Sequence, residues 1–533
     1  MWTRESQPNN MVINDPKGEL LQEFYVPGTY RGFQIVQFNL INPMNTDIYN
    51  PLMLAAEAAR NGDFIKCQMY VANIADVFFP KDGGDDPVWA NSASNAFQRA
   101  AFGLIDYYLE EETELRRFAE KTHMDGRTLE TKLDELWGHV TLYNCYQFFT
   151  ELTSKKLKNP AVEFTKDAKA GKYNNMSEDE YDAKLAEVER KSALWEDKPE
   201  ADLLTLYFNA TSVLPQNQIR TLAGNTNKSL RAMAGAEKMM ASVYGIAITA
   251  MSFFTDQTIS TLTSGTPSQN VDLAGLSFPR RLGFRLNADF MKKYHLLGMQ
   301  CEWHGYSDPL FTKEMGKDFR HEDIINRAGW ARYYFKGIMP DEIMYAKCEI
   351  KNPQTEQLIR TFYFKFQKMY QTSLSGRTYM KDPILGEKIV KNGVMTELRP
   401  VKDKNGNVTY KPGHVVFNTD RIVDIDTQPR IKQVKARAIT QFMLNYSEKP
   451  RMVFLVTPPH LTSYAKLILI LVKQLVDLNF DQSYTTKSNQ KPLYKTRYML
   501  DELGNLQSDG HGISGFQTML SIGLGLHSCP AYM

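Results

Sequence analysis

Short, uninterrupted apolar runs occur near both ends of the chain. They cover residues 11–13, 34–40, 452–456 and 498–500. Apolar runs of this kind are typical of parallel strands that are covered on both faces. The residues between the two pairs of runs lack short apolar runs of this kind. We therefore expect one largely parallel sheet whose two halves are far apart in the sequence.

Helical patterns accompany these runs. Residues 17–26 suit a helix closed by Pro27 and Gly28, and residues 88–109 place apolar side chains near one helical stripe. Residues 461–478 predict a further helix. The opening and closing parts of the chain are therefore expected to be α/β.

The middle of the chain has two other sequence patterns, one helical and one typical of β structure. From about 105 to 250 it is helical and charged, and Ser177 with Glu180 forms a capping-box signature. From about 330 to 425 it is mostly β, with a hairpin signal at residues 404–407. The predicted segments are 1–105 and 431–533 for the two parts of the core, 106–260 for an all-α insertion, and 261–430 for a mixed, β-rich insertion.

Composition places the chain among globular proteins. It has 533 residues, of which 43% are hydrophobic, 12% aromatic and 23% charged, with a net charge of +2. This composition excludes general disorder and a global basic field, so any nucleic-acid contact would need a local patch. The five cysteines form no C-x-x-C pair, which argues against a zinc ribbon, a redox motif or a secreted disulfide framework. We expect no transmembrane segment and no signal peptide.

Two acids directly follow the last apolar run. Residues 498–502 read Tyr-Met-Leu-Asp-Glu. In a Walker B arrangement the strand delivers one carboxylate to the Mg²⁺ shell and the next to an attacking water. Strand ends with two acids also occur by chance as solvated positions, and the pattern alone leaves both interpretations open.

The neighbouring residues strengthen the Walker B interpretation. Residues 501–506 read Asp-Glu-Leu-Gly-Asn-Leu, residues 14–20 read Asn-Asp-Pro-Lys-Gly-Glu-Leu, and shorter signatures stand at 50–52 and 89–93. In this order they resemble the type IV secretion coupling ATPases of conjugation, which are TraG/TraD-like and FtsK-related. The matching residues are Asp15, Pro16, Lys17, Gly18, Glu19, Asn50, Pro51, Trp89, Ser92, Asp501, Glu502, Gly504 and Asn505.

The resemblance implies a fold and a function. The fold would be a RecA-like P-loop NTPase core, mostly parallel sheet, split by the two insertions. The complete protein would be a hexamer on the cytoplasmic face of the bacterial membrane that uses ATP and Mg²⁺. It would recruit relaxase-bound single-stranded DNA and deliver it to the type IV secretion channel proteins. Asp501 would hold Mg²⁺ through water, Glu502 would activate the attacking water, and the all-α segment would select the substrate.

One expected part of this family is missing. No G-x-x-x-x-G-K-[ST] run occurs in the sequence, and Lys17 follows Pro16 instead of a glycine-rich loop. The family carries its Walker A loop before the segment that matches residues 15–19, and a further strand after the helix that follows the acids. We therefore expect a coupling protein truncated at both ends, of the Gram-positive type, whose ATP hydrolysis is in doubt. A non-hydrolysing scaffold module, a related DNA translocase and a secretion-channel ATPase remain alternatives.

Other candidates are weaker. Arg280, Arg281 and Arg285 could touch DNA phosphates, although a solvated basic turn is the simpler interpretation. His295 and His304 lack paired metal-ligand spacing and suit core or surface positions better. The three glutamates at 110–112 predict an exposed helix face.

Overall fold

The computed structural model describes most of the chain. The described residues are 9–42, 45–80, 87–122, 124, 126–196, 198–233, 237–372, 378–413, 438–457, 465–480, 492–500 and 528–531. The chain divides into two compact units. Unit 1 comprises Met1–Asp47, Glu114–Leu129 and Val271–Met533, and unit 2 comprises Ile48–Thr113 and Glu130–Asn270.

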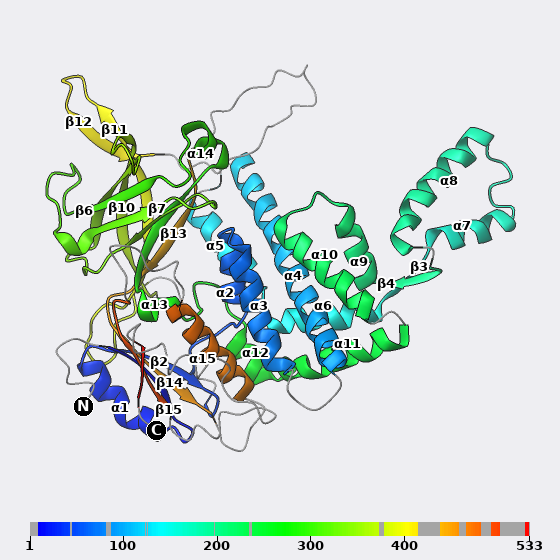
Figure 1. Cartoon of the computed structure of the whole chain (residues 1–533), viewed down its shortest axis with the longest axis horizontal. Coiled ribbons are helices and arrows are strands. Elements are labelled where there is room, and N and C mark those ends of the chain that lie inside the picture. The colour runs from blue at the N-terminus through cyan, green and yellow to red at the C-terminus, as the bar shows by residue number, and fades with distance from the viewer. Residues whose placement is uncertain are drawn as a thin grey trace. The chain divides into compact units, whose positions relative to one another are not determined.

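A five-stranded parallel sheet in unit 1 joins the two ends of the chain (Figure 1). Its order is β16-β15-β1-β14-β2, and every pair of neighbouring strands is parallel. The strands are β1 (Asn10–Asn14), β2 (Gln34–Asn39), β14 (Arg451–Val456), β15 (Thr496–Leu500) and β16 (Ser528–Ala531). The prediction that the four apolar runs share one parallel sheet is confirmed, because β14 lies between β1 and β2.

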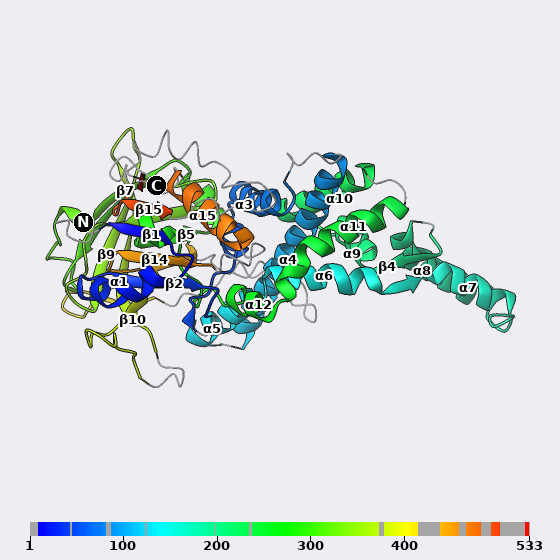
Figure 2. The same cartoon turned by 90° about the horizontal axis from the view of Figure 1, so that it is seen from below.

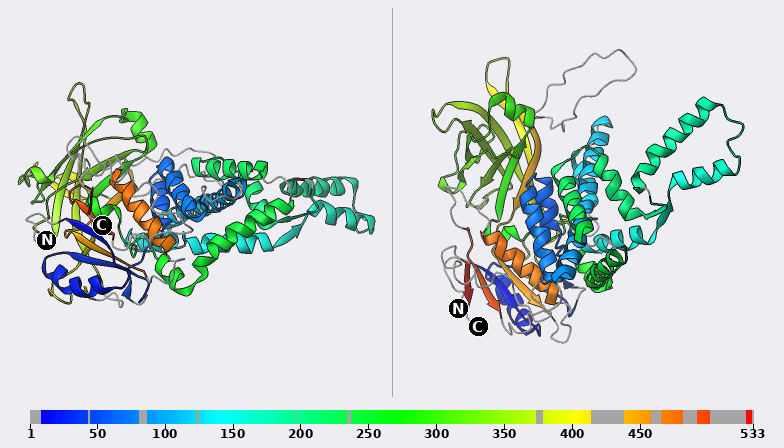
Figure 3. Two further views of the ribbon diagram at one scale, coloured as in Figure 1. Left: turned by 60° about the horizontal axis from the view of Figure 1, so that its bottom comes forward. Right: turned by 45° about the vertical axis from the view of Figure 1, so that its right-hand side comes forward.

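Helices cover both faces of this sheet. Helix α1 (Glu19–Tyr30) packs Leu21 against one face, together with Met11, Phe454 and their neighbours. Helix α15 (Ala465–Phe480) lies on the opposite face (Figures 2 and 3). This double covering explains why all the residues of β1 and β14 are buried.

Helix α1 corrects one sequence-based expectation. It does not end before Pro27 but continues through Pro27 and Gly28 to Tyr30. An added Cβ at Gly28 would lie 3.1 Å from Ile35 Cδ1 and 3.4 Å from Met452 Cε. The glycine therefore allows the last turn of the helix to pack closely on the sheet, and tertiary packing outweighs the local breaker signal.

The rest of unit 1 is mainly antiparallel β structure. One sheet has the order β12-β11-β10-β9-β6-β7 and another has the order β13-β5-β8. The strands are β5 (Arg280–Leu286), β6 (Gln300–Tyr306), β7 (Arg320–Ile324), β8 (Trp330–Tyr334), β9 (Ile343–Lys351), β10 (Leu358–Tyr370), β11 (Val390–Lys402), β12 (Val408–Pro412) and β13 (Ile439–Tyr446). The short helix α13 (Ala274–Ser277) precedes β5, whereas α14 (Ala288–Tyr294) and η5 (Lys317–Phe319) lie between strands. The hairpin predicted at residues 404–407 is present, because β11 and β12 pair around it.

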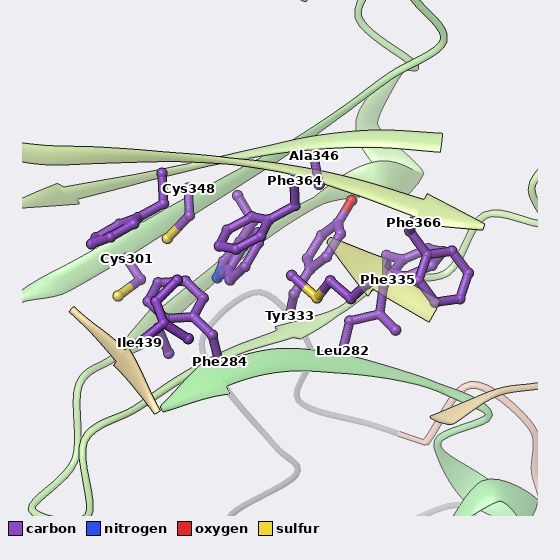
Figure 4. Packing of buried hydrophobic residues seen from close by; sticks show 14 of the residues in the cluster. Leu282, Phe284, Cys301, Tyr333, Phe335, Ala346, Cys348, Phe364, Phe366 and Ile439 are labelled. Atoms are coloured by element: carbon purple, nitrogen blue, oxygen red, sulfur yellow. The ribbon is translucent and has the colours of Figure 1, made fainter. Parts of the chain in front are cut away.

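An aromatic core lies between these two antiparallel sheets (Figure 4). Trp303 stacks on Tyr333 with ring centroids 4.8 Å apart, and it also stacks on Phe364 at 5.5 Å. Phe284 of β5 completes the group from the smaller sheet. Strand β9 supplies a regular alternation of buried and partly exposed residues, as expected for a strand with one face on a core.

Unit 2 is built almost entirely of helices. They are α2 (Met53–Arg60), α3 (Phe64–Phe78), α4 (Pro87–Lys121), α5 (Gly126–Trp137), α6 (Leu142–Ser154), α7 (Pro160–Lys169), α8 (Glu178–Ser192), η3 (Ala193–Trp195), α9 (Leu203–Val213), α10 (Gln218–Met233), α11 (Glu237–Met251), η4 (Ser252–Thr255) and α12 (Gln257–Thr263). The division between the units falls within α4 and α5. Ser177 and Glu180 form the predicted capping box at the start of α8.

Part of unit 2 forms a helical arm, defined here as residues 156–202. Strands β3 (Lys156–Lys158) and β4 (Glu200–Asp202) pair as an antiparallel ribbon from which α7 and α8 extend (Figure 1). Trp195 Nε1 donates to the Leu157 carbonyl at 3.0 Å and packs with Ala201 at the base of the arm. Helix α8 buries none of its residues. Leu206 of α9 belongs to the same cluster, so the base of the arm shares a small core with α9, whereas its outer helix is largely solvated.

No single helix in the described part of the chain is both long and apolar enough to cross a membrane. Met239–Thr255 and Gln257–Thr263 meet the criterion only together, and they are bent by 84°.

Candidate functional site

The topology of the parallel sheet marks one edge as a candidate site. The connection from β1 through α1 to β2 passes over β14, whereas the connection from β14 through α15 to β15 passes over β1 in the other direction. Right-handed crossovers in opposite directions place α1 and α15 on opposite faces. The loop after β1 therefore leads to one face of the sheet, and the loop after β14 leads to the other face. Such a switch point, at the carboxyl ends of the strands, is where open α/β sheets bind ligands.

A tight turn follows β1 at this edge. The Gly18 N–H donates to the Asp15 carbonyl at 3.2 Å, and Gly18 has a φ of +75°. Asp at the first position, Pro at the second and Gly at the fourth suit such a turn. Asp15 Oδ2 also accepts a 2.7 Å hydrogen bond from the Leu21 N–H in the first turn of α1. The Asp-Pro-Lys-Gly sequence is thus explained locally as a turn and a helix cap.

This turn directs charged side chains outward. Asp15 and Pro16 are buried, whereas Lys17 and Glu19 are exposed. The buried pair fixes the turn and leaves an ammonium and a carboxylate at the carboxyl edge. Helix α1 begins here, so its N-terminus adds a positive partial charge.

Asn39 provides a second turn at the same edge. It ends β2, and its side-chain Oδ1 accepts from the N–H groups of Ile41 and Asn42 at 3.1 and 2.8 Å. Its own N–H donates to Thr46 Oγ1 at 3.0 Å. The loop after β2 is therefore held close to the strand end.

The acid pair lies beyond the described residues. Asp501, Glu502, Gly504 and Asn505 all fall there. The strand that leads to them, β15, ends at Leu500, which pairs with Asn14 at the end of β1. The predicted roles of the acid pair therefore stay predictions.

The other matching residues belong to unit 2. Asn50 is 1% exposed, its Nδ2 donates to the Val140 carbonyl at 2.8 Å, and its N–H donates to Asn270 Oδ1 at 2.7 Å. Pro51 is buried next to it. Asn50 thus joins three segments of the helical unit, which is a structural role.

Trp89 and Ser92 lie on α4. Trp89 is partly exposed and Ser92 is fully buried. The Ser92 hydroxyl has no hydrogen-bond partner within the described structure. The residues that carry the family resemblance are therefore divided between the two units. Among the described ones, only residues 15–19 form one local site.

The arginines proposed to touch DNA occupy different environments. Arg280 and Arg281 are 2% and 4% exposed and lie on strand β5, so the expected solvated basic turn is wrong. Arg280 donates to the carbonyls of Lys336 and Glu448. Apolar neighbours enclose the strand and leave these guanidiniums to internal acceptors. Arg285 is only partly buried.

The amino edge of the parallel sheet contains a polar cluster that sequence patterns did not reveal. Arg281 donates to Asp272 Oδ1 at 2.7 Å, and Arg451, the first residue of β14, donates to the Asp272 carbonyl at 2.5 Å. Burial raises the pKa of Asp272, but the charges of Arg281 and Arg451 outweigh this effect and hold the pKa below its usual value. No spacing signal links these residues, because the fold alone brings them together.

The structure also shows the surroundings of His295, His304 and the three glutamates at 110–112. His304 Nδ1 lies 2.8 Å from Glu314 Oε1, and His295 ends α14 with a φ of +52°. No group of three or more metal-ligating side chains occurs in the described ranges. Glu112 is 8% exposed and accepts from Trp137 Nε1 at 2.6 Å, so the expected exposed helix face holds for Glu110 but is wrong for Glu112. Its position on α4 turns it toward the core, away from solvent.

Comparison with known families supplies the decisive observation. Residues 6–267 match the model of the family described as type IV secretory system conjugative DNA transfer. Over this range, which is just under half of the chain, the sequence is similar to conjugative DNA transfer proteins of type IV secretion systems. The matched range contains β1, α1, β2 and nearly all of unit 2, whereas the acid pair lies outside it. No curated protein matches the chain significantly.

Proposed function

We propose that this chain is a conjugative DNA transfer protein and that it acts as the coupling ATPase of a type IV secretion system. In this role it recruits relaxase-bound single-stranded DNA and passes it to the channel proteins. The family match over residues 6–267 carries the proposal, and the parallel sheet with a switch point supports it. The complete assembly would be a hexamer at the cytoplasmic face of the membrane, with a RecA-like core in each subunit.

The carboxyl edge of the parallel sheet is the proposed nucleotide site. Asp501 would hold Mg²⁺ through water, and Glu502 would orient and deprotonate the attacking water. They directly follow β15 in the sequence, and the last residue of β15 pairs with the last residue of β1, which supports this assignment. The sequence has no G-x-x-x-x-G-K-[ST] run, so the proposed site consists of the strand ends and the acid pair alone.

The helical unit is the proposed recruiting element for the relaxase. Its helices carry mixed charge, and the described part of it holds no cluster of metal ligands that would suggest chemistry. The arm in particular exposes Leu157, Val162 and Met176, together with charged residues along α8. Exposed apolar side chains among charges suit protein recognition.

A transfer assay tests the ATP-dependent role. Donor cells whose copy of the protein carries Glu502→Gln should transfer a mobilisable plasmid at least about a hundredfold less often, which is the usual loss when a catalytic base is removed. The matched control is Glu23→Gln, since Glu23 is exposed on α1. Equal transfer by wild type and Glu502→Gln would remove the catalytic role of the acid pair.

The absence of a P-loop in the sequence favours a second candidate, a non-hydrolysing scaffold that binds the relaxase or channel proteins. The same assay separates the two functions. A scaffold predicts loss of transfer when the chain is deleted but full transfer with Glu502→Gln.

A further inference from the structure

A pocket of about 240 Å³ lies in unit 1, at one end of the smaller antiparallel sheet. Arg285 and Asn287 line it from β5 and the start of α14, Met291 from α14, Arg327 from the turn before β8, and Thr440 from β13. The remaining lining residues are one leucine and two alanines. Two guanidiniums therefore line a pocket whose wall contains no carboxylate.

The two arginines are held differently. Arg285 Nε donates to the Ala328 carbonyl at 2.8 Å, which fixes the side chain against the turn that also carries Arg327. Arg327 is exposed. One guanidinium is thus positioned in the pocket wall while the other can adjust to a ligand. A planar, always charged guanidinium suits the oxygens of a phosphate group.

Helix α14, which lines the pocket through Met291, also carries cations and an aromatic ring on which Arg360 of β10 packs. Arg360 lies with its Cζ 4.5 Å from the ring centre of Tyr294, and Arg360 Nη2 donates to the Tyr294 hydroxyl at 2.6 Å. Lys293 Nζ lies 5.4 Å from the same ring centre. Met291 and Tyr294 are three residues apart, so they lie on neighbouring parts of the helix surface. Asp289 is the one acid on α14 and Lys292 adds another exposed cation.

We propose that this pocket binds a backbone phosphate of single-stranded nucleic acid, with Arg285 and Arg327 as the phosphate ligands and the α14 surface next to it as a platform for a base. The inference rests on the proposed function for its ligand class, because single-stranded DNA is the cargo of a coupling protein. Cations interleaved with aromatic rings are the usual composition of such surfaces. A free phosphate ion shares the chemistry of the pocket but gains nothing from the rings.

Oligonucleotide binding by the whole chain tests this inference. A fluorescently labelled oligothymidylate is titrated with wild type, Arg327→Glu, Arg285→Gln and the control Arg399→Glu, whose side chain is exposed on β11. One lost phosphate contact lowers affinity about eightfold at about 50 mM salt and reduces the slope of log affinity against log salt by about 0.7. We expect this loss for Arg327→Glu and Arg285→Gln but not for Arg399→Glu. Thermal unfolding of each variant shows whether it is folded.

The outcomes separate this inference from the proposed function. Oligonucleotide binding that is equally strong in wild type and Arg327→Glu overturns the pocket while leaving the coupling role intact. Wild type that binds inorganic phosphate as an Arg327-dependent ligand, but no oligonucleotide, overturns the nucleic-acid assignment and identifies a free phosphate site. Tyr294→Ala should weaken oligonucleotide binding without changing the salt slope, since stacking releases no counterions. If Tyr294→Ala binds the oligonucleotide with unchanged affinity, the proposal that the α14 surface stacks on a base is wrong.

Discussion

The side chain of Asn10 accepts a 2.7 Å hydrogen bond from the backbone N–H of Arg451, although 441 residues separate them. The Asn10 amide group also donates to the carbonyl of Leu276 in α13. Asn10 is fully buried at the start of β1, and Arg451 begins β14. One amide therefore joins the first strand of the sheet, a strand near the far end of the chain, and the segment that enters the antiparallel part of unit 1.

Replacement of Asn10 by alanine should destabilise unit 1. The change leaves a buried N–H and a buried carbonyl without their partner, which costs about 2–4 kcal/mol in total. Urea denaturation followed by circular dichroism measures the loss. Gln22→Ala, at an exposed position of α1, is the control and should leave the transition unchanged. An Asn10→Ala transition at the wild-type urea concentration would contradict a joining role for this residue.

Asp272 should make stability depend on pH. Its folded pKa is lowered because Arg281 and Arg451 outweigh the effect of burial, so its contribution is present above the unfolded pKa of about 3.9 and is lost as pH falls through the folded pKa. Asp272→Asn should be less stable than wild type at pH 7, by about 1–3 kcal/mol. The gap between the two proteins should narrow when the pH falls from about 5 to below about 3.

Urea midpoints measured across this pH range check the Asp272 prediction. Asp289→Asn, an exposed change on α14, is the control. A constant gap between wild type and Asp272→Asn at all pH values would mean that the carboxylate charge does not stabilise the fold.

Sequence patterns were sufficient to predict the strands of the parallel sheet. They did not predict the side-chain contacts that connect the sheet to distant segments. Strands β1 and β14 are apolar throughout because helices cover both faces, and that texture can be read without a structure. The partners of Asn10 and Asp272 are set by the packing of distant segments, and no local spacing encodes them. Pro27 failed as a helix stop for a related reason, since α1 gains more from packing on the sheet than it loses at one residue.

The candidate site was only partly readable from sequence. Residues 15–19 could be found because their turn is local, and the structure explains each as turn, cap or exposed charge. Arg280 and Arg281 were misread because a short basic run looks the same on the surface and in a strand with internal acceptors. Arg327 was missed because its pocket forms only when β5, β8 and β13 come together.

Glu112 should be important for the stability of unit 2. Its carboxylate accepts from Arg60 Nε at 2.9 Å and from Trp137 Nε1 at 2.6 Å. Glu112→Gln keeps the shape but removes the charge that pairs with Arg60, and we expect a loss of about 1–3 kcal/mol. Thermal unfolding and the fluorescence of buried Trp137 measure it. Glu114→Gln, at an exposed position on the same helix, should behave as wild type, and equal stability of the two variants would contradict the prediction.

Removal of the helical arm should weaken partner binding while the rest of the chain still folds. Because the cluster of Trp195, Ala201 and Leu206 at its base is kept, replacing residues 160–192 with a short Gly-Ser linker between Asn159 and Ala193 should leave the other helices folded. We expect the shortened chain to capture at least about tenfold less relaxase–DNA complex in a pull-down, since the exposed apolar surface of the arm is lost. Full capture by a folded shortened chain would move the recruiting surface elsewhere in unit 2.

Purified residues 1–533 should not hydrolyse ATP above the buffer rate. A triphosphate is held by oriented backbone N–H groups and a lysine, and carboxylates such as Asp501 and Glu502 repel it in their absence. The nearest P-loop lookalike, residues 222–229, lies inside α10, where the backbone N–H groups already serve the helix. Release of phosphate from ATP is compared for wild type and Asp501→Ala, and we expect both to match buffer. Activity in wild type that is lost in Asp501→Ala would show that this chain contains a phosphate site of another construction, and would place the whole catalytic centre within it.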